Sequence, residues 1–420
     1  MSSINDISKE NRALMKRSED VFELPPPDEL SQDLMTRLTS LIRDEITAAG
    51  GHISFARYME LALYAPGLGY YSAGRQKFGA AGDFLTAPEI SPLFSRCLAR
   101  QCAQLIRTPG QVDILEFGAG SGIMAADLLK ELALLDCLPE RYLILETSAD
   151  LRDRQQALLQ QRLPGWMDRI SWLEHLPEPG FQGIVLANEV LDAMPVHRLV
   201  MTADGLQEVG VAWRDEAFAL CSTKIMQPRL ARRANALVQM AGACPYEVGS
   251  LFEVNLAAED WIHSLAAFMG RGLALLIDYG YPRREYYHPE RRAGTLSCFY
   301  RHRHHDDALI LTGLQDITAH IDFTAMAEAA EEAGMSVAGF SSQATFLQDC
   351  GLAEMVQFSD DDSLQQRLAL AAQIKKLMLP GEMGEVFKVL ALTQQLDISL
   401  LGFTSRQHAL QMAGAADVSG

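Results

Sequence analysis

The chain has 420 residues, 48% of them hydrophobic, and a formal net charge of -18 at pH 7. This acidic balance argues against non-specific binding to nucleic acid, which requires a basic surface, so we expect no nucleic acid partner. No apolar run reaches the roughly 18 residues that span a bilayer, so we expect no membrane insertion. The seven cysteines are scattered without CxxC spacing, which is typical of reduced thiols and predicts a cytoplasmic protein.

The first part of the chain predicts a tail followed by helices. Residues 1–30 are polar and lack the apolar core of a secretory signal, so they read as a tail. Residues 31–108 predict an N-terminal helical segment, because apolar side chains recur there at helical spacing. Its helices are expected at 31–49, 53–64 and 92 to about 107.

A long loop rich in glycine and aromatic residues interrupts this segment between 65 and 91. Long loops in compact proteins are usually functional or disordered, and the aromatic content here favours function. We expect Gly82, Asp83 and Phe84 to fold over a cofactor as a lid. Packing alone is the alternative.

Residues 109–420 predict one large α/β domain. Apolar strands alternate with helical stretches, and this alternation is typical of a mostly parallel sheet with helices on both faces. The expected strands are 112–117, 142–146, 183–188 and 273–278, and the expected helices lie near 122–135, 149–162 and 257–269.

Two inserted segments interrupt the alternation, at about 197–256 and at 280–323. The first begins as a small antiparallel meander over residues 197–222, and the second is rich in Tyr, Arg and His. Both follow strand ends, which is where open α/β sheets bind their ligands. We expect both to lie on the substrate side.

The stretch "LEFGAGSG", residues 115–122, places three glycines between a strand and a helix. Such a turn lets the backbone approach a ligand closely. It lacks the GK[ST] of a nucleotide-triphosphate loop. Its third glycine also comes one residue early for a dinucleotide site. The spacing of Gly118, Gly120 and Gly122, with Ala119 between them, therefore favours S-adenosylmethionine.

Two acidic residues flank this turn. Glu146 ends the second strand, where a carboxylate accepts both ribose hydroxyls of a nucleoside. A carboxylate at this position would bind the ribose of NAD equally well. Alternatively, Glu146 is an ordinary acidic residue that precedes the next helix. Glu116 is placed to bind the methionine amino group or to support the turn. Both are expected to contact the cofactor.

Several longer motifs resemble the MidA-like family. They are "FGAAGDFLTAPEIS" (78–91), "LEFGAGSG" (115–122), "LANEVLDAMPVHR" (186–198), "LLIDYGY" (275–281) and "QDITAHIDF" (315–323). The resemblance runs from about residue 45 to about 393. It implies a class I S-adenosylmethionine-dependent methyltransferase with a Rossmann-like, seven-stranded sheet.

The family's mitochondrial member is a protein arginine methyltransferase that modifies a complex I subunit and supports assembly of that complex. The resemblance therefore implies a protein substrate that carries an acceptor arginine. One departure is visible: mitochondrial members read GPGRG where this chain reads GAGSG, so Ser121 replaces an arginine.

Methyl transfer from a sulfonium is an in-line displacement, which requires mainly alignment and exclusion of water. An acceptor guanidinium would be held by carboxylates. Asn188, Glu189 and Asp192 follow the fourth strand and are the predicted catalytic residues, with Asn188 also near the cofactor. Glu189 is the first choice for the acceptor-binding acid. Its alternative role is to cap the next helix.

Further candidates for acceptor binding follow the later strands. Asp278 and Tyr279 end "ALLIDYG", and His305 and His320 lie in or beside the second insert. The run "RHRHHDD" (301–307) invites a metal interpretation, but methyl transfer needs no metal and we expect none. Loop ordering or acceptor recognition, through hydrogen bonds among His305, Asp316, His320 and Asp322, is preferred.

Two other functions remain open at this point. The chain could be a non-catalytic assembly chaperone built on a methyltransferase fold, or a methyltransferase acting on a small molecule. The apolar helices at either end could form a homodimer surface or complete the core.

Overall fold

The structure is a computed structural model that describes residues 24–73, 85–241, 246–356 and 363–405. The chain forms two compact units, each described by itself. The insert unit comprises residues 1–75, 193–257 and 284–319, and the sheet unit comprises 76–192, 258–283 and 320–420. None of the helices in the described ranges is long and apolar enough to cross a lipid bilayer.

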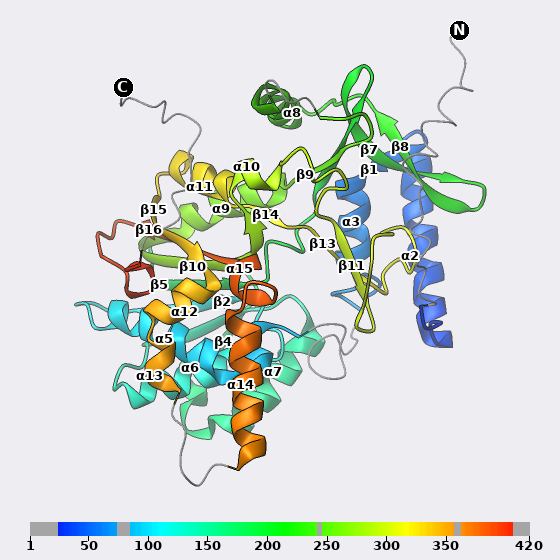
Figure 1. The fold of residues 1–420 in the computed structure, drawn as a ribbon. Helices are drawn as coiled ribbons and strands as arrows, with labels where there is room; N and C mark the ends of the chain where they lie inside the picture. The colour runs from blue at the N-terminus through cyan, green and yellow to red at the C-terminus, as the bar shows by residue number, and fades with distance from the viewer. Residues whose placement is uncertain (1–23, 74–84, 242–245, 357–362, 406–420) are drawn as a thin grey trace, which may run out of the picture. The chain divides into compact units, whose positions relative to one another are not determined.

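The sheet unit is built on a large, mostly parallel sheet (Figure 1). Its main path has the order β15-β16-β10-β5-β2-β3-β4, and the short β14 pairs with the end of β10. Only β16 runs against its neighbours, because it is antiparallel to both β10 and β15. The strands are β2 (Asp113–Phe117), β3 (Tyr142–Leu145), β4 (Ile170–Leu173), β5 (Phe181–Asn188), β10 (Met269–Tyr281), β14 (Ile321–Asp322), β15 (Ser336–Ser342) and β16 (Phe387–Gln394).

Helices cover both faces of this sheet, as predicted (Figure 1). Phe117 of β2 packs against Trp261 of α9 on the face opposite α5 and α6. The helices are α4 (Ala87–Ile90), α5 (Pro92–Ile106), α6 (Ile123–Leu134), α7 (Ala149–Arg162), α9 (Leu256–Phe268), α11 (Phe323–Glu332), α12 (Gln343–Asp349), α13 (Leu352–Met355), α14 (Leu364–Met378) and α15 (Met383–Val386), with 3-10 turns η1 (Pro164–Arg169) and η2 (Leu401–Phe403).

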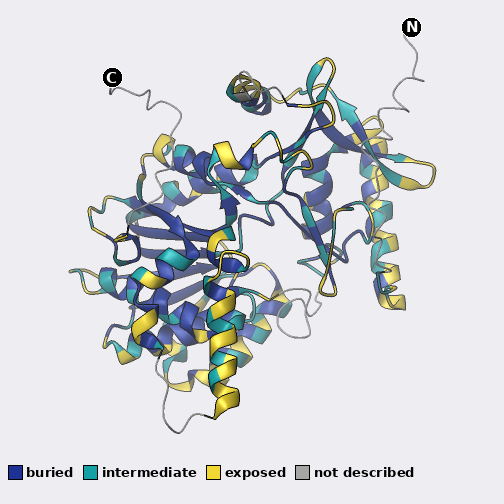
Figure 2. Cartoon of the chain, in the orientation of Figure 1, coloured by how far each residue is buried: buried dark blue, intermediate teal, exposed yellow. Residues whose placement is uncertain are grey.

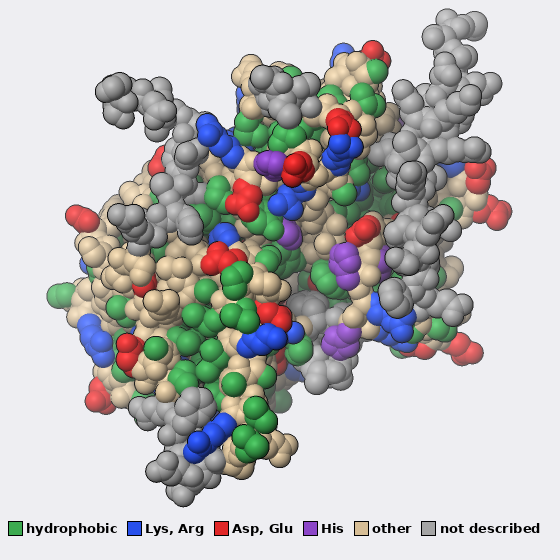
Figure 3. Space-filling view, in the orientation of Figure 1, with side chains coloured by type: hydrophobic (Ala, Val, Ile, Leu, Met, Phe, Trp, Pro, Cys, Tyr) green, Lys and Arg blue, Asp and Glu red, His purple; other side chains and the backbone are tan. Residues whose placement is uncertain are grey.

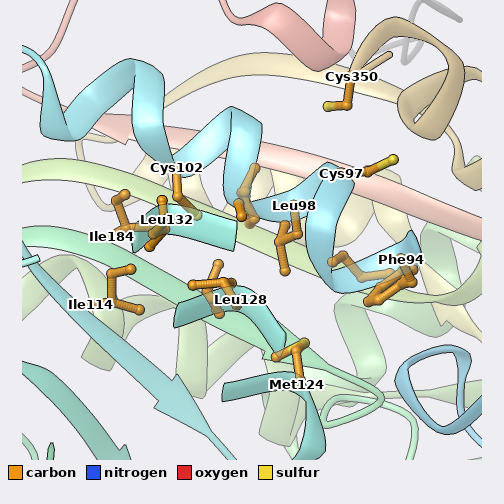
Figure 4. Packing of buried hydrophobic residues seen from close by; sticks show 14 of the residues in the cluster. Phe94, Cys97, Leu98, Cys102, Ile114, Met124, Leu128, Leu132, Ile184 and Cys350 are labelled. Carbon is orange, nitrogen blue, oxygen red and sulfur yellow. The ribbon is translucent and has the colours of Figure 1, made fainter. Parts of the chain in front are cut away.

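The core beside the sheet is formed by α5 and α6 (Figure 4). Both helices carry buried apolar residues four positions apart, a spacing that lines one helical face. These rows pack against each other and over Ile114 and Ile184 of the sheet. The rows are Phe94, Leu98 and Cys102 on α5 and Met124, Leu128 and Leu132 on α6.

The insert unit joins the N-terminal helices to both inserted segments. Strand β1 pairs with β7 through His52 and Ala212, which ties the lead-in to the first insert. The predicted meander is confirmed, since β6, β7 and β8 are antiparallel neighbours. The elements are α2 (Glu29–Ala48), β1 (His52–Ser54), α3 (Phe55–Tyr64), β6 (His197–Thr202), β7 (Gly205–Arg214), β8 (Ala217–Thr223), α8 (Pro228–Ala241), β9 (Leu251–Val254), α10 (Arg283–Tyr286), β11 (Ser297–Tyr300), β12 (Arg303–His305) and β13 (Asp316–Thr318).

These units divide the chain differently from the expected boundaries at 30 and 108. Helix α5 was expected with the N-terminal helices, but its apolar face packs on α6 in the sheet unit. Helices α2 and α3 instead share a core with the inserts, in which Leu38 and Phe55 meet Val211 and Ile317. Burial of apolar faces between distant segments decides this division.

Burial differs strongly between elements of the sheet unit (Figure 2). The central strands β2 and β5 are almost fully buried, whereas α14 buries only Leu377.

On the face shown in Figure 3, Lys and Arg side chains lie among Asp and Glu side chains.

Candidate cofactor and acceptor site

The turn between β2 and α6 adopts a backbone shape that suits glycine. Gly118, Gly120 and Gly122 have φ angles of 60°, 55° and 84°, in the left-handed region that only glycine enters without steric cost. A Cβ atom on Gly122 would lie 3.4 Å from Gln155, and one on Gly118 would lie 3.5 Å from Val190. The turn therefore requires glycine mainly for its left-handed backbone, since the added Cβ atoms at these two positions would make only close van der Waals contacts.

Glu146 follows β3, and its carboxylate accepts hydrogen bonds from α7 and from the residue that caps the N-terminus of α7. The backbone N–H of Ser148 donates to Oε1 at 2.9 Å, and the Gln155 amide donates to Oε2 at 3.1 Å. The same amide donates to the carbonyl of Gly120 at 3.0 Å. Trp172 in turn donates its indole N–H to Oε1 of Gln155 at 2.9 Å. Gln155 thus connects Glu146 directly to the glycine turn.

Gln155 was not singled out from the sequence. Helix α7 contains several glutamines in the stretch "RQQALLQQR", and of these Gln155 lies on the same helical face as Leu151 and Leu159, four residues from each. In the structure Gln155 has no exposed surface, and buried polar groups require partners. Its spacing from the two leucines could have indicated burial, whereas its partners in the glycine turn and at Glu146 are visible only in the structure.

Glu116 lies fully buried in β2 beneath the glycine turn. The hydroxyl of Tyr142 donates to its Oε2 at 2.7 Å. Burial raises the pKa of Glu116 to about 7, because the charged form loses its hydration. The carboxyl group is therefore poised to change its charge near neutral pH.

A second group of polar side chains follows β5. Glu189 has a φ angle of 53°, which is unusual for a residue with a side chain, and its N–H donates to the carbonyl of Ile277 at 2.9 Å. Such conformations cost free energy and are often found at functional sites. The Asn188 amide donates to Glu189 Oε1 at 3.2 Å, while Asn188 Oδ1 is buried without a hydrogen-bond partner among the described residues. That oxygen is available to a ligand.

Asp278 in β10 holds the segment that follows Glu189. Its Oδ2 accepts the N–H groups of Leu191 at 3.0 Å and Asp192 at 3.2 Å, and its Oδ1 accepts that of Tyr279 at 2.9 Å. Burial, with the nearby charges of Asp192 and Glu189, raises its pKa well above the usual range. These contacts suit a residue that positions the segment after Glu189.

Tyr279 connects the two strand ends through its side chain. Its hydroxyl donates to the Asp192 carboxylate. Its ring packs edge-on against His320 and Phe387, with centroids 5.1 and 5.3 Å away. Tyr279 therefore contacts two other predicted site residues, Asp192 and His320.

Of the remaining predicted residues, three are not described by the structure and one belongs to the insert unit. Gly82, Asp83 and Phe84 fall outside the described residues. His305 belongs to β12 in the insert unit, where burial lowers its pKa and its Nδ1 accepts the Asp307 N–H at 3.3 Å. Other members of the predicted network have described partners of their own: Asp316 accepts from the Tyr71 hydroxyl, and Asp322 caps α11 and pairs with Arg283.

Curated relatives cover most of the chain. The mitochondrial protein arginine methyltransferase NDUFAF7 homolog of Drosophila melanogaster is 30% identical over 84% of each protein. The mitochondrial protein arginine methyltransferase NDUFAF7 of Danio rerio is 28% identical, over 88% of this chain and 90% of its own. These mitochondrial names overturn the prediction of a cytoplasmic protein, which rested only on reduced cysteines and the lack of a recognisable targeting signal.

A solved structure is similar over nearly its whole length. A protein from Burkholderia thailandensis bound to S-adenosyl-homocysteine is 42% identical, with a TM-score of 0.87, over 92% of this chain and 99% of its own. A native structure from the same organism has a TM-score of 0.84 at 41% identity. The predicted Rossmann-like methyltransferase fold is confirmed.

A family model described as "Putative S-adenosyl-L-methionine-dependent methyltransferase" matches residues 97–341, more than half of the chain. This range contains the glycine turn, Glu146 and the group around Glu189. The resemblance to MidA-like proteins and the predicted cofactor, S-adenosylmethionine, are confirmed by these comparisons. The chain therefore belongs to this family of S-adenosylmethionine-dependent methyltransferases.

Proposed function

We propose that the protein transfers methyl groups from S-adenosylmethionine to an arginine side chain of another protein. The observation that supports this acceptor most strongly is the pair of acidic residues Glu189 and Asp192 after β5, on a segment that Asp278 of β10 holds through backbone hydrogen bonds. A planar guanidinium is recognised best by carboxylates. The names of the Drosophila and Danio relatives point to the same acceptor class.

The cofactor would be held by the glycine turn and the acids beside it. The residues fit this group: Gly118, Gly120 and Gly122, with Ala119 between them, form a left-handed turn, and the carboxylates of Glu116 and Glu146 accept hydrogen bonds from neutral donors. Glu146 would accept the ribose hydroxyls, Glu116 would face the methionine ammonium group, and Asn188 Oδ1 would accept a further hydrogen bond. The Burkholderia protein with bound S-adenosyl-homocysteine supports this assignment.

The bound cofactor supplies a methyl group on a positively charged sulfur. Transfer to the acceptor nitrogen would use this sulfur as the leaving group, so the electron pair of the carbon–sulfur bond would stay on sulfur. The methylated nitrogen then loses a proton, which Glu189 accepts and passes to solvent. The protein's main contribution is alignment, because Glu189 fixes the guanidinium plane while the surrounding hydrogen bonds fix Glu189.

Asp278 and Tyr279 would act as positioning residues in this scheme. Asp278 anchors the N–H groups of Leu191 and Asp192, and Tyr279 anchors the Asp192 carboxylate. Both the backbone and a side chain of the segment that follows Glu189 are thereby fixed by hydrogen bonds. His320 would support the Tyr279 ring and, through it, the acceptor site.

The affinity for S-adenosylmethionine is expected to rise with pH because of Glu116. In the ligand-free protein the raised pKa of about 7 means that much of this carboxyl group is protonated at lower pH. A bound ammonium group lowers that pKa, so binding releases a proton. Affinity should then increase by at most about tenfold per pH unit below pH 7 and level off above it.

Calorimetric titration at about pH 6 and about pH 7 measures this dependence. The Glu116→Gln variant should show a flat profile over the same range, since the group that titrates is gone. The Glu354→Gln variant alters an exposed acid paired with Arg100 and should keep the wild-type slope. A wild-type affinity that does not change with pH would contradict the proposed role of Glu116.

Labelling with methyl-labelled S-adenosylmethionine tests the acceptor class. The full-length protein is incubated with a host lysate, and labelled proteins are digested and examined by mass spectrometry for methylarginine. A respiratory complex I subunit is the first acceptor to test, given the resemblance to the MidA-like family. Label only in low-mass material would indicate a small-molecule methyltransferase. Cofactor binding without any labelled product would favour an assembly chaperone instead.

A further inference from the structure

We propose that Glu89 sets the cofactor selectivity of the glycine turn by placing a carboxylate at the N-terminus of α6. This inference rests on the proposed cofactor site and adds a residue to it. Glu89 comes from α4, a short helix within the loop at 65–91 that was expected to be functional, although this residue was not singled out. Its effect would be to favour a cationic ligand and to reject a phosphate.

The position of Glu89 is determined by the packing of α4. Ala87 and Pro88 are buried, and the N–H groups of Glu89 and Ile90 donate to the carbonyl of Thr86 at 3.0 and 3.1 Å. The next residue, Ser91, caps α5. Glu89 therefore lies on a segment that is secured on both sides, and its side chain is only partly exposed.

A short chain of hydrogen bonds links Glu89 to the first turn of α6. The Ser121 hydroxyl donates to Glu89 Oε1, and the N–H of Ile123 donates to Ser121 Oγ at 3.3 Å. The N-terminus of a helix carries a partial positive charge and normally attracts an external anion. Here the Glu89 carboxylate supplies a negative charge near this helix end, and the Ser121 side chain links it to the helix.

The charges around the turn strengthen this selectivity. Glu89, Glu116 and Glu146 approach it from three elements, and each accepts hydrogen bonds from neutral groups, namely a hydroxyl, a phenol, and an amide with a backbone N–H. Glu89 also contributes to the raised pKa of Asp127 in α6, after the larger effect of burial. A ligand with a sulfonium and an ammonium group is therefore attracted, whereas a pyrophosphate is repelled.

The experiment compares the binding of two probes to the full-length protein by calorimetry. The probes are S-adenosylmethionine and ADP, an adenine nucleotide that carries phosphates. In Glu89→Gln the ratio of the ADP Kd to the S-adenosylmethionine Kd is expected to fall about tenfold, as befits the loss of one charge at a helix N-terminus. Glu354→Gln removes an exposed acid elsewhere in the sheet unit and should leave the ratio unchanged.

The possible outcomes separate this inference from the proposed function. An unchanged ratio in a folded Glu89→Gln variant, with normal binding of S-adenosylmethionine to the wild type, overturns the role of Glu89 alone. A wild type that does not bind S-adenosylmethionine overturns the proposed function. If Glu89→Gln loses its cooperative thermal transition, Ser121→Ala takes its place. It breaks the hydrogen bond from Ser121 and should lower the ratio about threefold, and an unchanged ratio there also overturns the inference.

Discussion

Glu189→Gln is expected to lower kcat/KM for methyl transfer to a protein acceptor by about thirtyfold or more, because removing one partner of a desolvated charge pair costs ~2–5 kcal/mol. Glutamine keeps the size of the side chain and its contact with Asn188. It cannot neutralise a guanidinium or accept the proton released on transfer. Turnover with the purified acceptor, measured with labelled cofactor, tests this expectation.

Binding of S-adenosylmethionine provides the internal check on this variant. Its Kd should stay within about twofold of the wild type, because the lost interaction is with the acceptor. The Glu354→Gln variant should behave as the wild type in both measurements, since it alters an exposed acid paired with Arg100. Undiminished turnover of Glu189→Gln would remove Glu189 from the catalytic role, and lost cofactor binding would assign it to the cofactor site instead.

Gly120→Val is expected to weaken binding of S-adenosylmethionine by about a hundredfold or more, because a β-branched residue strongly disfavours the left-handed backbone found here. The φ angle at Gly120 is 55°, and its carbonyl accepts the Gln155 amide that also holds Glu146. Distorting the turn therefore disturbs both the left-handed glycine backbone and Glu146, the acid proposed to bind the ribose. Equilibrium dialysis with labelled cofactor measures the loss.

A glycine outside the site supplies the matched control. Gly165 lies in η1, away from the left-handed region, and a Cβ atom there would meet nothing within 4 Å. Gly165→Val should bind the cofactor as the wild type does. Thermal unfolding of both variants shows whether Gly120→Val remains folded. Normal cofactor affinity in a folded Gly120→Val protein would place the cofactor elsewhere.

Much of the sheet unit follows from local sequence patterns. The predicted strands and helices at 112–117, 142–146, 149–162 and 183–188 correspond to β2, β3, α7 and β5 within a few residues. Apolar runs and helical spacing report burial of a face, which is a local property. Strand β4 was missed, because "ISWL" is a four-residue strand with one exposed and two half-buried side chains and so lacks a continuous apolar pattern.

The roles assigned to individual site residues remain predictions, but the structure changes what some of them are expected to do. Asp278 was expected to contact the acceptor, and its oxygens instead accept backbone N–H groups from the segment after Glu189. Gln155 was not singled out, and Glu89 was covered only by the expectation that the loop at 65–91 is functional. Each meets its partner through a contact between segments more than thirty positions apart.

The sequence by itself determined the α/β class, the glycine turn and the acids at the strand ends, because backbone sterics and the alternation of strands and helices are written in neighbouring residues. Only the tertiary structure decided which polar side chains meet across elements, and that α2 and α3 share a core with the inserts while α5 joins the sheet. Such pairings depend on which apolar faces bury each other in three dimensions, and on which polar groups that burial then forces together.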